Sequence, residues 1–282
     1  RHRGTPALAY SVLAAPPMSS APASSHLHST ELGTSGPRVA FLHGLFGQGK
    51  NWTAIAKALS DDFRVTLVDL PNHGRSGWTD RFGYPEMADA VAALLAGQAA
   101  GEQVSVVGHS MGGKVAMALA LLYPDLVQRL CVVDVAPVSY PTVSGFAPYV
   151  EGMRALDLDN LPSRASADAA LQPWVKNATV QSFLLQNLRR DGAGWRWQMN
   201  LKLLGDHLDE LGRWPELAVP PYTGPTLWLA GADSDYVTDD YAPAMRALFP
   251  KARLSRVKRA GHWLHSEQPE VFLAALRRFL SS

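Results

Sequence analysis

The stretch Gly108-His109-Ser110-Met111-Gly112 decides the fold, because it reads Gly-x-Ser-x-Gly between a strand pattern and a helix pattern. Residues 104–107 (VSVV) have the β-branched bias of a buried strand, and residues 114–122 (KVAMALALL) have the composition of a helix packed on a sheet. In such a strand-turn-helix the serine lies on a strained turn, and the flanking glycines let neighbouring backbone pass close. The motif therefore predicts a nucleophile, Ser110, at the edge of a sheet.

A second strand pattern leads into a loop suited to stabilising negative charge. Residues 39–42 (VAFL) run into the glycine-rich sequence HGLFG at 43–47. Glycines let this loop fold back, so that the main-chain N–H of Leu45 and that of Met111, at the helix start, face one point. We expect these two N–H groups to form an oxyanion hole beside Ser110.

The base predicted to activate the serine is His262. It lies in the sequence AGHW, after a strand pattern at 253–257 and before a helix pattern at 269–280. Of the nine histidines, only this one follows the nucleophile, stands at a strand end next to glycine and precedes the last helix. His109, inside the serine motif, is expected to point away under the sheet.

The acid that orients the histidine has two candidate places, and the first is a strand end at Asp134. The apolar pattern at 129–135 (RLCVVDV) predicts a buried strand that ends there. A carboxylate is costly to bury unless it is hydrogen-bonded, and a histidine N–H would satisfy it.

The second place is the loop after the strand pattern at 226–230 (TLWLA). The common arrangement puts the acid three residues after a glycine in this loop, and counting from Gly231 that position is Ser234. Asp233 and Asp235 stand on either side of it, although an aspartate on a turn usually only caps the turn. The residues alone leave Asp134, Asp233 and Asp235 open as the acid.

The alternation of strand and helix patterns predicts an α/β protein with a mostly parallel central sheet flanked by helices. A strand is also expected at 27–32. Helical, strand-free sequence at 137–222 interrupts the alternation, which predicts a helical cap inserted between the strand ending near Asp134 and the strand starting near Thr226. The expected domains are a leader at 1–26, a core at 27–136 and 223–282, and the cap at 137–222.

Composition narrows the class of protein. The chain has 282 residues, 47% of them hydrophobic, and a net charge of +1, which gives no strong field for nucleic acid. No apolar run approaches the roughly 18 residues of a membrane span, and the apolar piece at 7–15 makes a poor secretory signal. We expect a cytoplasmic protein whose native start is Met18.

Several stretches together resemble the α/β-hydrolase fold family and, within it, the ABHD11-like or YbfF-like serine esterase group. In that group the loop after the strand that corresponds to 226–230 resembles Gly-Gly-Asn-Ser and lacks an acid, so the resemblance favours Asp134 as the acid. This sequence departs from the group by carrying Asp233 and Asp235 in that loop. The matching stretches are HGLFGQGKNW (43–52), DLPNHGRS (69–76), GHSMGGKVAM (108–117), VVDVAPVSY (132–140) and AGHWLHSEQPEVFLAALRRFL (260–280).

The expected activity is hydrolysis of carboxylic esters or thioesters with small to medium acyl groups through an acyl-serine intermediate, without cofactor or metal. Ser110, His262 and Asp134 are the predicted triad, with a small-molecule substrate as the partner and a monomer or small homo-oligomer as the assembly. Carbon-carbon bond hydrolysis and cofactor-free perhydrolysis (haloperoxidase activity) use the same triad and remain alternatives. A ligand receptor with vestigial hydrolysis is an alternative of another class.

Overall fold

The structure, a computed structural model, describes residues 26–141 and 144–282; the expected start at Met18 and nearly all of the expected leader lie outside them. One sheet of seven strands has the order β1-β3-β2-β4-β5-β8-β9, parallel throughout except where β1 pairs with β3. This confirms the expected fold class. The strands of the sheet are β1 (Ser29–Leu32), β2 (Arg38–Leu42), β3 (Arg64–Val68), β4 (Val104–His109), β5 (Val127–Val133), β8 (Thr226–Gly231) and β9 (Ala252–Val257).

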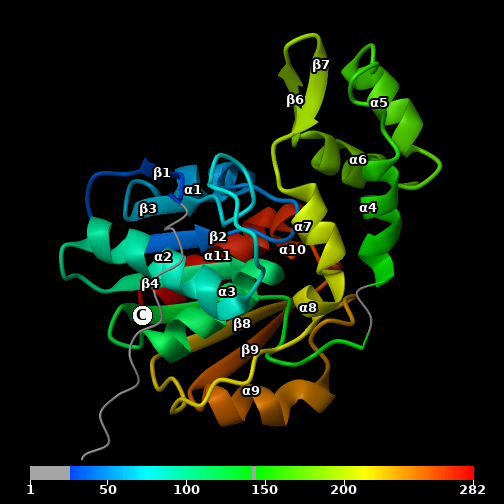
Figure 1. The fold of residues 1–282 in the computed structure, drawn as a ribbon. Helices are drawn as coiled ribbons and strands as arrows, with labels where there is room; N and C mark the ends of the chain where they lie inside the picture. Colours follow the sequence, from blue (N-terminus) through cyan, green and yellow to red (C-terminus); the bar gives the residue numbers. More distant parts are fainter. Residues whose placement is uncertain (1–25, 142–143) are drawn as a thin grey trace, which may run out of the picture.

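Helices cover both faces of this sheet (Figure 1). Alternate strand residues divide between two apolar clusters: Ala40 and Leu42 join the cluster that contains α2 and α3, whereas Val39 and Phe41 join the one that contains α1 and α11. The core helices are α1 (Thr53–Leu59), α2 (Tyr84–Ala99), α3 (Met111–Leu122), α9 (Ala242–Leu248), α10 (Leu264–Glu267) and α11 (Pro269–Leu280), with 3₁₀ turns at Gly49–Trp52 and Asp239–Tyr241. In the described part of the chain, no helix has the length and hydropathy needed to cross a membrane.

The elements between β5 and β8 gather on one side of the sheet (Figure 1). They include a two-stranded antiparallel hairpin, so the expectation of strand-free sequence between residues 137 and 222 is wrong. The strands are only four residues long and join at Asp191-Gly192, a turn signal that predicts a hairpin. The elements are a 3₁₀ turn (Ser144–Phe146), α4 (Ala147–Arg154), α5 (Arg164–Leu171), α6 (Ala178–Leu185), β6 (Leu188–Asp191), β7 (Gly194–Trp197), α7 (Leu201–Asp206) and α8 (Leu208–Gly212).

A buried asparagine joins this insert to the loop that follows β2. Asn187 is 0% exposed, and its side-chain amide donates a hydrogen bond to the carbonyl oxygen of Phe46 at 2.8 Å. Its own oxygen accepts one from Nε2 of Gln48, also at 2.8 Å. Because both groups are buried, losing either partner would leave an unsatisfied polar atom. The insert is therefore held to the loop that carries Leu45.

Two buried histidines join the loop after β2 to the loop after β3. Nε2 of His43 accepts the N–H of Leu70 at 2.9 Å, and Nε2 of His73 accepts the N–H of Phe46 at 3.1 Å. Their Nδ1 atoms face the carbonyl oxygens of Gly44 and Pro71, so each ring is a neutral tautomer with its proton on Nδ1. Burial, together with the neighbouring His43, lowers the pKa of His73 to about 3, and burial lowers the pKa of His43 as well.

This histidine pair makes the fold sensitive to acid. His73 stays neutral in the folded protein, whereas the unfolded chain takes up a proton below about pH 6.5. The contribution of His73 to stability is therefore fully present above that pH and falls by about 1.4 kcal/mol per pH unit as the pH drops towards 3. The lowered pKa of His43 acts in the same direction. Urea unfolding between pH 7.5 and 4.5 measures the slope.

The matched variant is His73→Gln, whose side-chain oxygen can still accept the N–H of Phe46 but does not titrate. Its free energy of unfolding should depend less steeply on pH than that of wild type, because about one proton fewer is taken up on unfolding. Equal slopes for the two proteins would contradict the assignment of His73 as a neutral buried acceptor.

Candidate active site

Ser110 lies at the sharp turn between β4 and α3, with φ 54° and ψ −120°. A side chain at Gly108 would place Cβ 2.2 Å from the carbonyl oxygen of Gly112, and one at Gly112 would place Cβ 2.4 Å from the carbonyl oxygen of His43. Only glycine fits at either position, because β4, α3 and the loop after β2 touch through their backbones there. This close backbone packing fixes the position of Ser110 at the carboxyl edge of the sheet.

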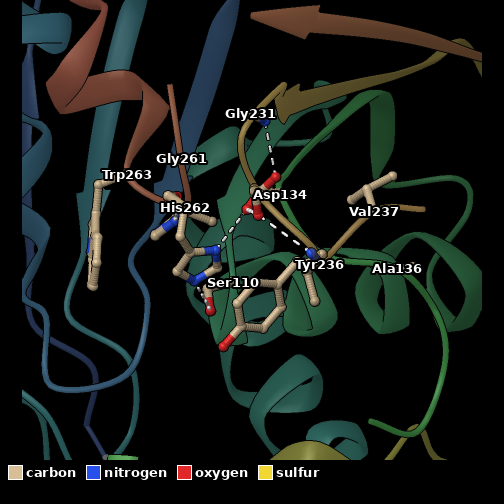
Figure 2. Close-up of polar contacts among 12 residues, drawn as sticks. Ser110, Asp134, Ala136, Gly231, Tyr236, Val237, Gly261, His262 and Trp263 are labelled. Atoms are coloured by element: carbon tan, nitrogen blue, oxygen red, sulfur yellow. Dashed lines mark hydrogen bonds and ion pairs between the residues drawn. The ribbon is translucent and has the colours of Figure 1, made fainter. Parts of the chain in front are cut away.

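His262 lies between the serine and a buried carboxylate (Figure 2). Its Nε2 is 3.0 Å from Oγ of Ser110, and its Nδ1 is 2.7 Å from Oδ2 of Asp134. The three residues come from the ends of β4 and β5 and from the loop after β9, which the parallel sheet brings to one edge. With its proton on Nδ1, the imidazole can donate to the carboxylate and accept the proton of the serine hydroxyl.

Asp134 is 0% exposed and has three hydrogen-bond donors. Oδ1 accepts the N–H of Gly231 at 3.0 Å, and Oδ2 accepts both His262 and the hydroxyl of Ser234, the latter at 2.5 Å. These donors offset the cost of burying the charge. Ser234 was not predicted to take part, although its position three residues after Gly231 is the sequence signal that could have pointed to it.

The structure does not bring the alternative carboxylates to the histidine. Asp233 and Asp235 are both exposed, on either side of Ser234. The serine hydroxyl, rather than a neighbouring carboxylate, therefore fills the space beside Asp134 in this loop.

Two further rings hold His262 in place. The ring of Tyr236 stacks on the imidazole, with centroids 4.0 Å apart and planes 22° apart (Figure 2). Nε2 of His109 donates to the carbonyl oxygen of His262 at 2.7 Å. The expectation that His109 points away under the sheet is therefore wrong, because its ring packs between His262 and His265. Burial keeps the pKa of His109 well below its ordinary value, so the ring is neutral.

Leu45 and Met111 lie on either side of the serine. Leu42, at the end of β2, is in register with Gly108 of β4, so the loop after β2 begins next to the serine turn. A Cβ built on Gly44 would be 3.4 Å from Cβ of Ser110, which shows how closely this loop passes. Within the described residues, the main-chain N–H groups of Leu45 and Met111 donate to no other group. Both are available to an oxyanion.

Two small pockets meet at Ser110. One contains His262. The other lacks the histidine and is largely apolar. The first is lined by His43, Gly44, Leu45, Gly47, Asn51, Trp52, His109, Ser110, Phe146, Phe183, His262, Trp263 and His265. The second is lined by Leu45, Tyr84, Ser110, Met111, Lys114, Val135, Tyr140, Phe146, Leu208, Leu211, Gly212 and Tyr236.

Comparison with known proteins gives this site its family. Residues 37–269 match the family model described as alpha/beta hydrolase fold. The chain is 40% identical over 251 residues to the sn-1-specific diacylglycerol lipase ABHD11 of Mus musculus, covering 87% of this chain and 81% of that one. It is 33% identical over 243 residues to esterase YbfF of Escherichia coli (strain K12), covering 86% and 92%.

A solved structure, a marine microorganism esterase, superposes with a TM-score of 0.88 at 35% identity and covers 91% of this chain and all of that one. These findings confirm the resemblance expected from the sequence motifs. The chain belongs to the α/β-hydrolase fold family, in the group of serine ester hydrolases that includes ABHD11 and YbfF.

Proposed function

We propose that this serine ester hydrolase works through Ser110 as nucleophile, His262 as general base and acid, and Asp134 as the acid that orients the histidine. The observation that carries the proposal is the unbroken line of hydrogen bonds from Ser110 Oγ through His262 to the buried Asp134. His262 takes the serine proton as Oγ attacks the carbonyl carbon, and an acyl-serine forms when the leaving group departs. Water activated by the same histidine then releases the carboxylic acid.

In this proposal the N–H groups of Leu45 and Met111 hold the negative oxygen of the tetrahedral intermediate. Met111 is the first residue of α3, so the helix dipole adds to the effect. Donors of this kind supply stabilisation only when charge develops, and losing one typically costs about 10²- to 10³-fold in rate.

Each of the two pockets holds a different part of the substrate. The leaving oxygen must receive a proton from His262, so the leaving group belongs in the pocket that contains the histidine. The acyl group then belongs in the second pocket, between Met111, Tyr140 and Leu211. The apolar lining of this pocket suits small to medium acyl groups of carboxylic esters or thioesters.

We further propose the division into a core at 27–136 and 223–282 and a cap at 137–222, because all seven strands of the central sheet lie in the core ranges. A cytoplasmic location and a monomeric or small homo-oligomeric assembly complete the proposal. Cell fractionation and light scattering test these two points.

Ser110→Ala should lose at least about 10³-fold in kcat/KM on p-nitrophenyl acetate, butyrate and octanoate, because no other group can form the acyl intermediate. The matched control is Ser266→Ala, an exposed serine of α10, which should retain wild-type rates and melting temperature. Equal turnover by wild type and Ser110→Ala would contradict the mechanism. Equal inactivity would favour the carbon-carbon hydrolase or receptor alternatives.

Asp134→Asn should lower kcat by about 10²- to 10⁴-fold with little change in KM, because the histidine loses the partner that fixes its tautomer and stabilises its cation. Asp235→Asn, made next to Asp134's partner Ser234 but at an exposed position, should stay close to wild type. The reverse pattern in steady-state kinetics would transfer the role to Asp235.

A further inference from the structure

The acyl pocket contains a charged side chain that the mechanism does not use. Lys114 is only 2% exposed and lines the pocket among largely apolar and aromatic side chains. Ser110 is the N-cap residue of α3 and Lys114 lies four residues later, so the two are separated by roughly 6 Å along the helix axis. Both residues line the same cavity, and their backbones are about one helical turn apart.

The ammonium group of Lys114 has partners for two of its three protons. Nζ donates to the carbonyl oxygens of Gly212 and Arg213, each at 2.8 Å, at the carboxyl end of α8. It also lies 4.9 Å from the ring centroid of Tyr140 and 5.6 Å from that of Tyr84. Within the described residues it forms no ion pair with a carboxylate.

A buried cation without a counter-ion is costly, and two neutral carbonyl groups offset only part of that cost. Burial accordingly lowers the pKa of Lys114 to about 7. Structure alone does not require a charge here, since a methionine would fill the same space among Leu211, Tyr84 and Tyr140 without desolvating an amine. When the amine is protonated, no carboxylate of the described residues balances its charge, and the amine lines the same pocket as Ser110.

We propose that Lys114 is a specificity-determining residue that binds a carboxylate at the far end of the acyl chain. This inference rests on the proposed esterase function and on the assignment of this pocket to the acyl group. The preferred substrates are then half-esters or half-thioesters of short dicarboxylic acids. Acyl chains of about four or five carbons are the first to test, because the backbones of Ser110 and Lys114 are about one helical turn apart.

The low polarity of the pocket makes this pairing selective. Charges attract more strongly where water is excluded, so a carboxylate beside Lys114 gains more than it would on the surface. An acyl chain ending in a methyl group leaves the cation unpaired. The difference between the two chains should therefore appear as a preference in kcat/KM, carried mostly by KM because the contact is remote from the reacting carbonyl.

The test compares monoethyl glutarate with ethyl valerate, two ethyl esters whose five-carbon acyl chains end in a carboxylate and a methyl group. Wild type should prefer the half-ester in kcat/KM, and Lys114→Met should lower that preference by at least about 10-fold, because a hydrogen-bonded charge pair is lost. Lys114→Gln, which keeps a donor for the carbonyl oxygen of Gly212, provides a second uncharged variant with the same expected loss if the methionine variant folds poorly.

An unchanged preference in both uncharged variants, with normal hydrolysis of ethyl valerate, would overturn the role of Lys114 and leave the esterase function standing. If neither ester is hydrolysed, the esterase function fails, and calorimetric titration of Ser110→Ala with free glutarate still tests the carboxylate site. Glutarate should bind at least about 10-fold more tightly than valerate, and adding Lys114→Gln should abolish the difference. Equal binding of the two acids would overturn the site.

Discussion

The backbone contact between the start of α3, the end of β4 and the loop after β2 is the constraint on which the rest of the site depends. It requires glycine at positions 108 and 112 and a positive φ at Ser110. The positions of the other proposed catalytic groups depend on this contact. These groups are the N–H of Met111 at the helix N-terminus, the loop with Leu45, and His262. A methyl group at either glycine would push these parts away from one another.

Most polar groups beneath the site are paired and neutral, although Nδ1 of the buried His265 has no hydrogen-bond partner among the described residues. His43, His73 and His109 are buried as neutral rings that each use their nitrogens for backbone contacts. Asp134 is a buried carboxylate at the carboxyl edge, with three donors around it. Lys114 differs from these groups, because its charge lacks a protein counter-ion within the described residues. The histidines and Asp134 therefore stabilise the site, whereas Lys114 is the side chain proposed to bind the substrate.

Much of the fold could be predicted because its signals are local. The buried strands, the serine turn and the last helix each depend on a few adjacent residues, and the structure has the last helix at the predicted bounds, 269–280. The position of His109 and the contacts of Tyr236 could not be predicted. They depend on how β4, β8 and the loop after β9 meet at the sheet edge, which no short stretch records.

The hairpin in the insert was missed for a different reason. Its strands are only four residues long, and each has a single buried residue, Leu188 or Trp197, so the sequence there has no alternating apolar pattern. The division of the cavity into two pockets also had no sequence signal, because it results from residues of the insert, such as Leu211, meeting core residues at Ser110.

The contact of Asn187 with Phe46 and Gln48 has a consequence for exchanging modules between enzymes of this family. The cap is hydrogen-bonded to the same short loop that carries Leu45, one residue from the proposed oxyanion donor. A chimaera that receives a foreign cap without an equivalent of Asn187 would lose substrate selectivity and, in addition, the support of its catalytic loop. A transplanted cap should therefore keep an asparagine at position 187, and the recipient core should keep a glutamine at position 48.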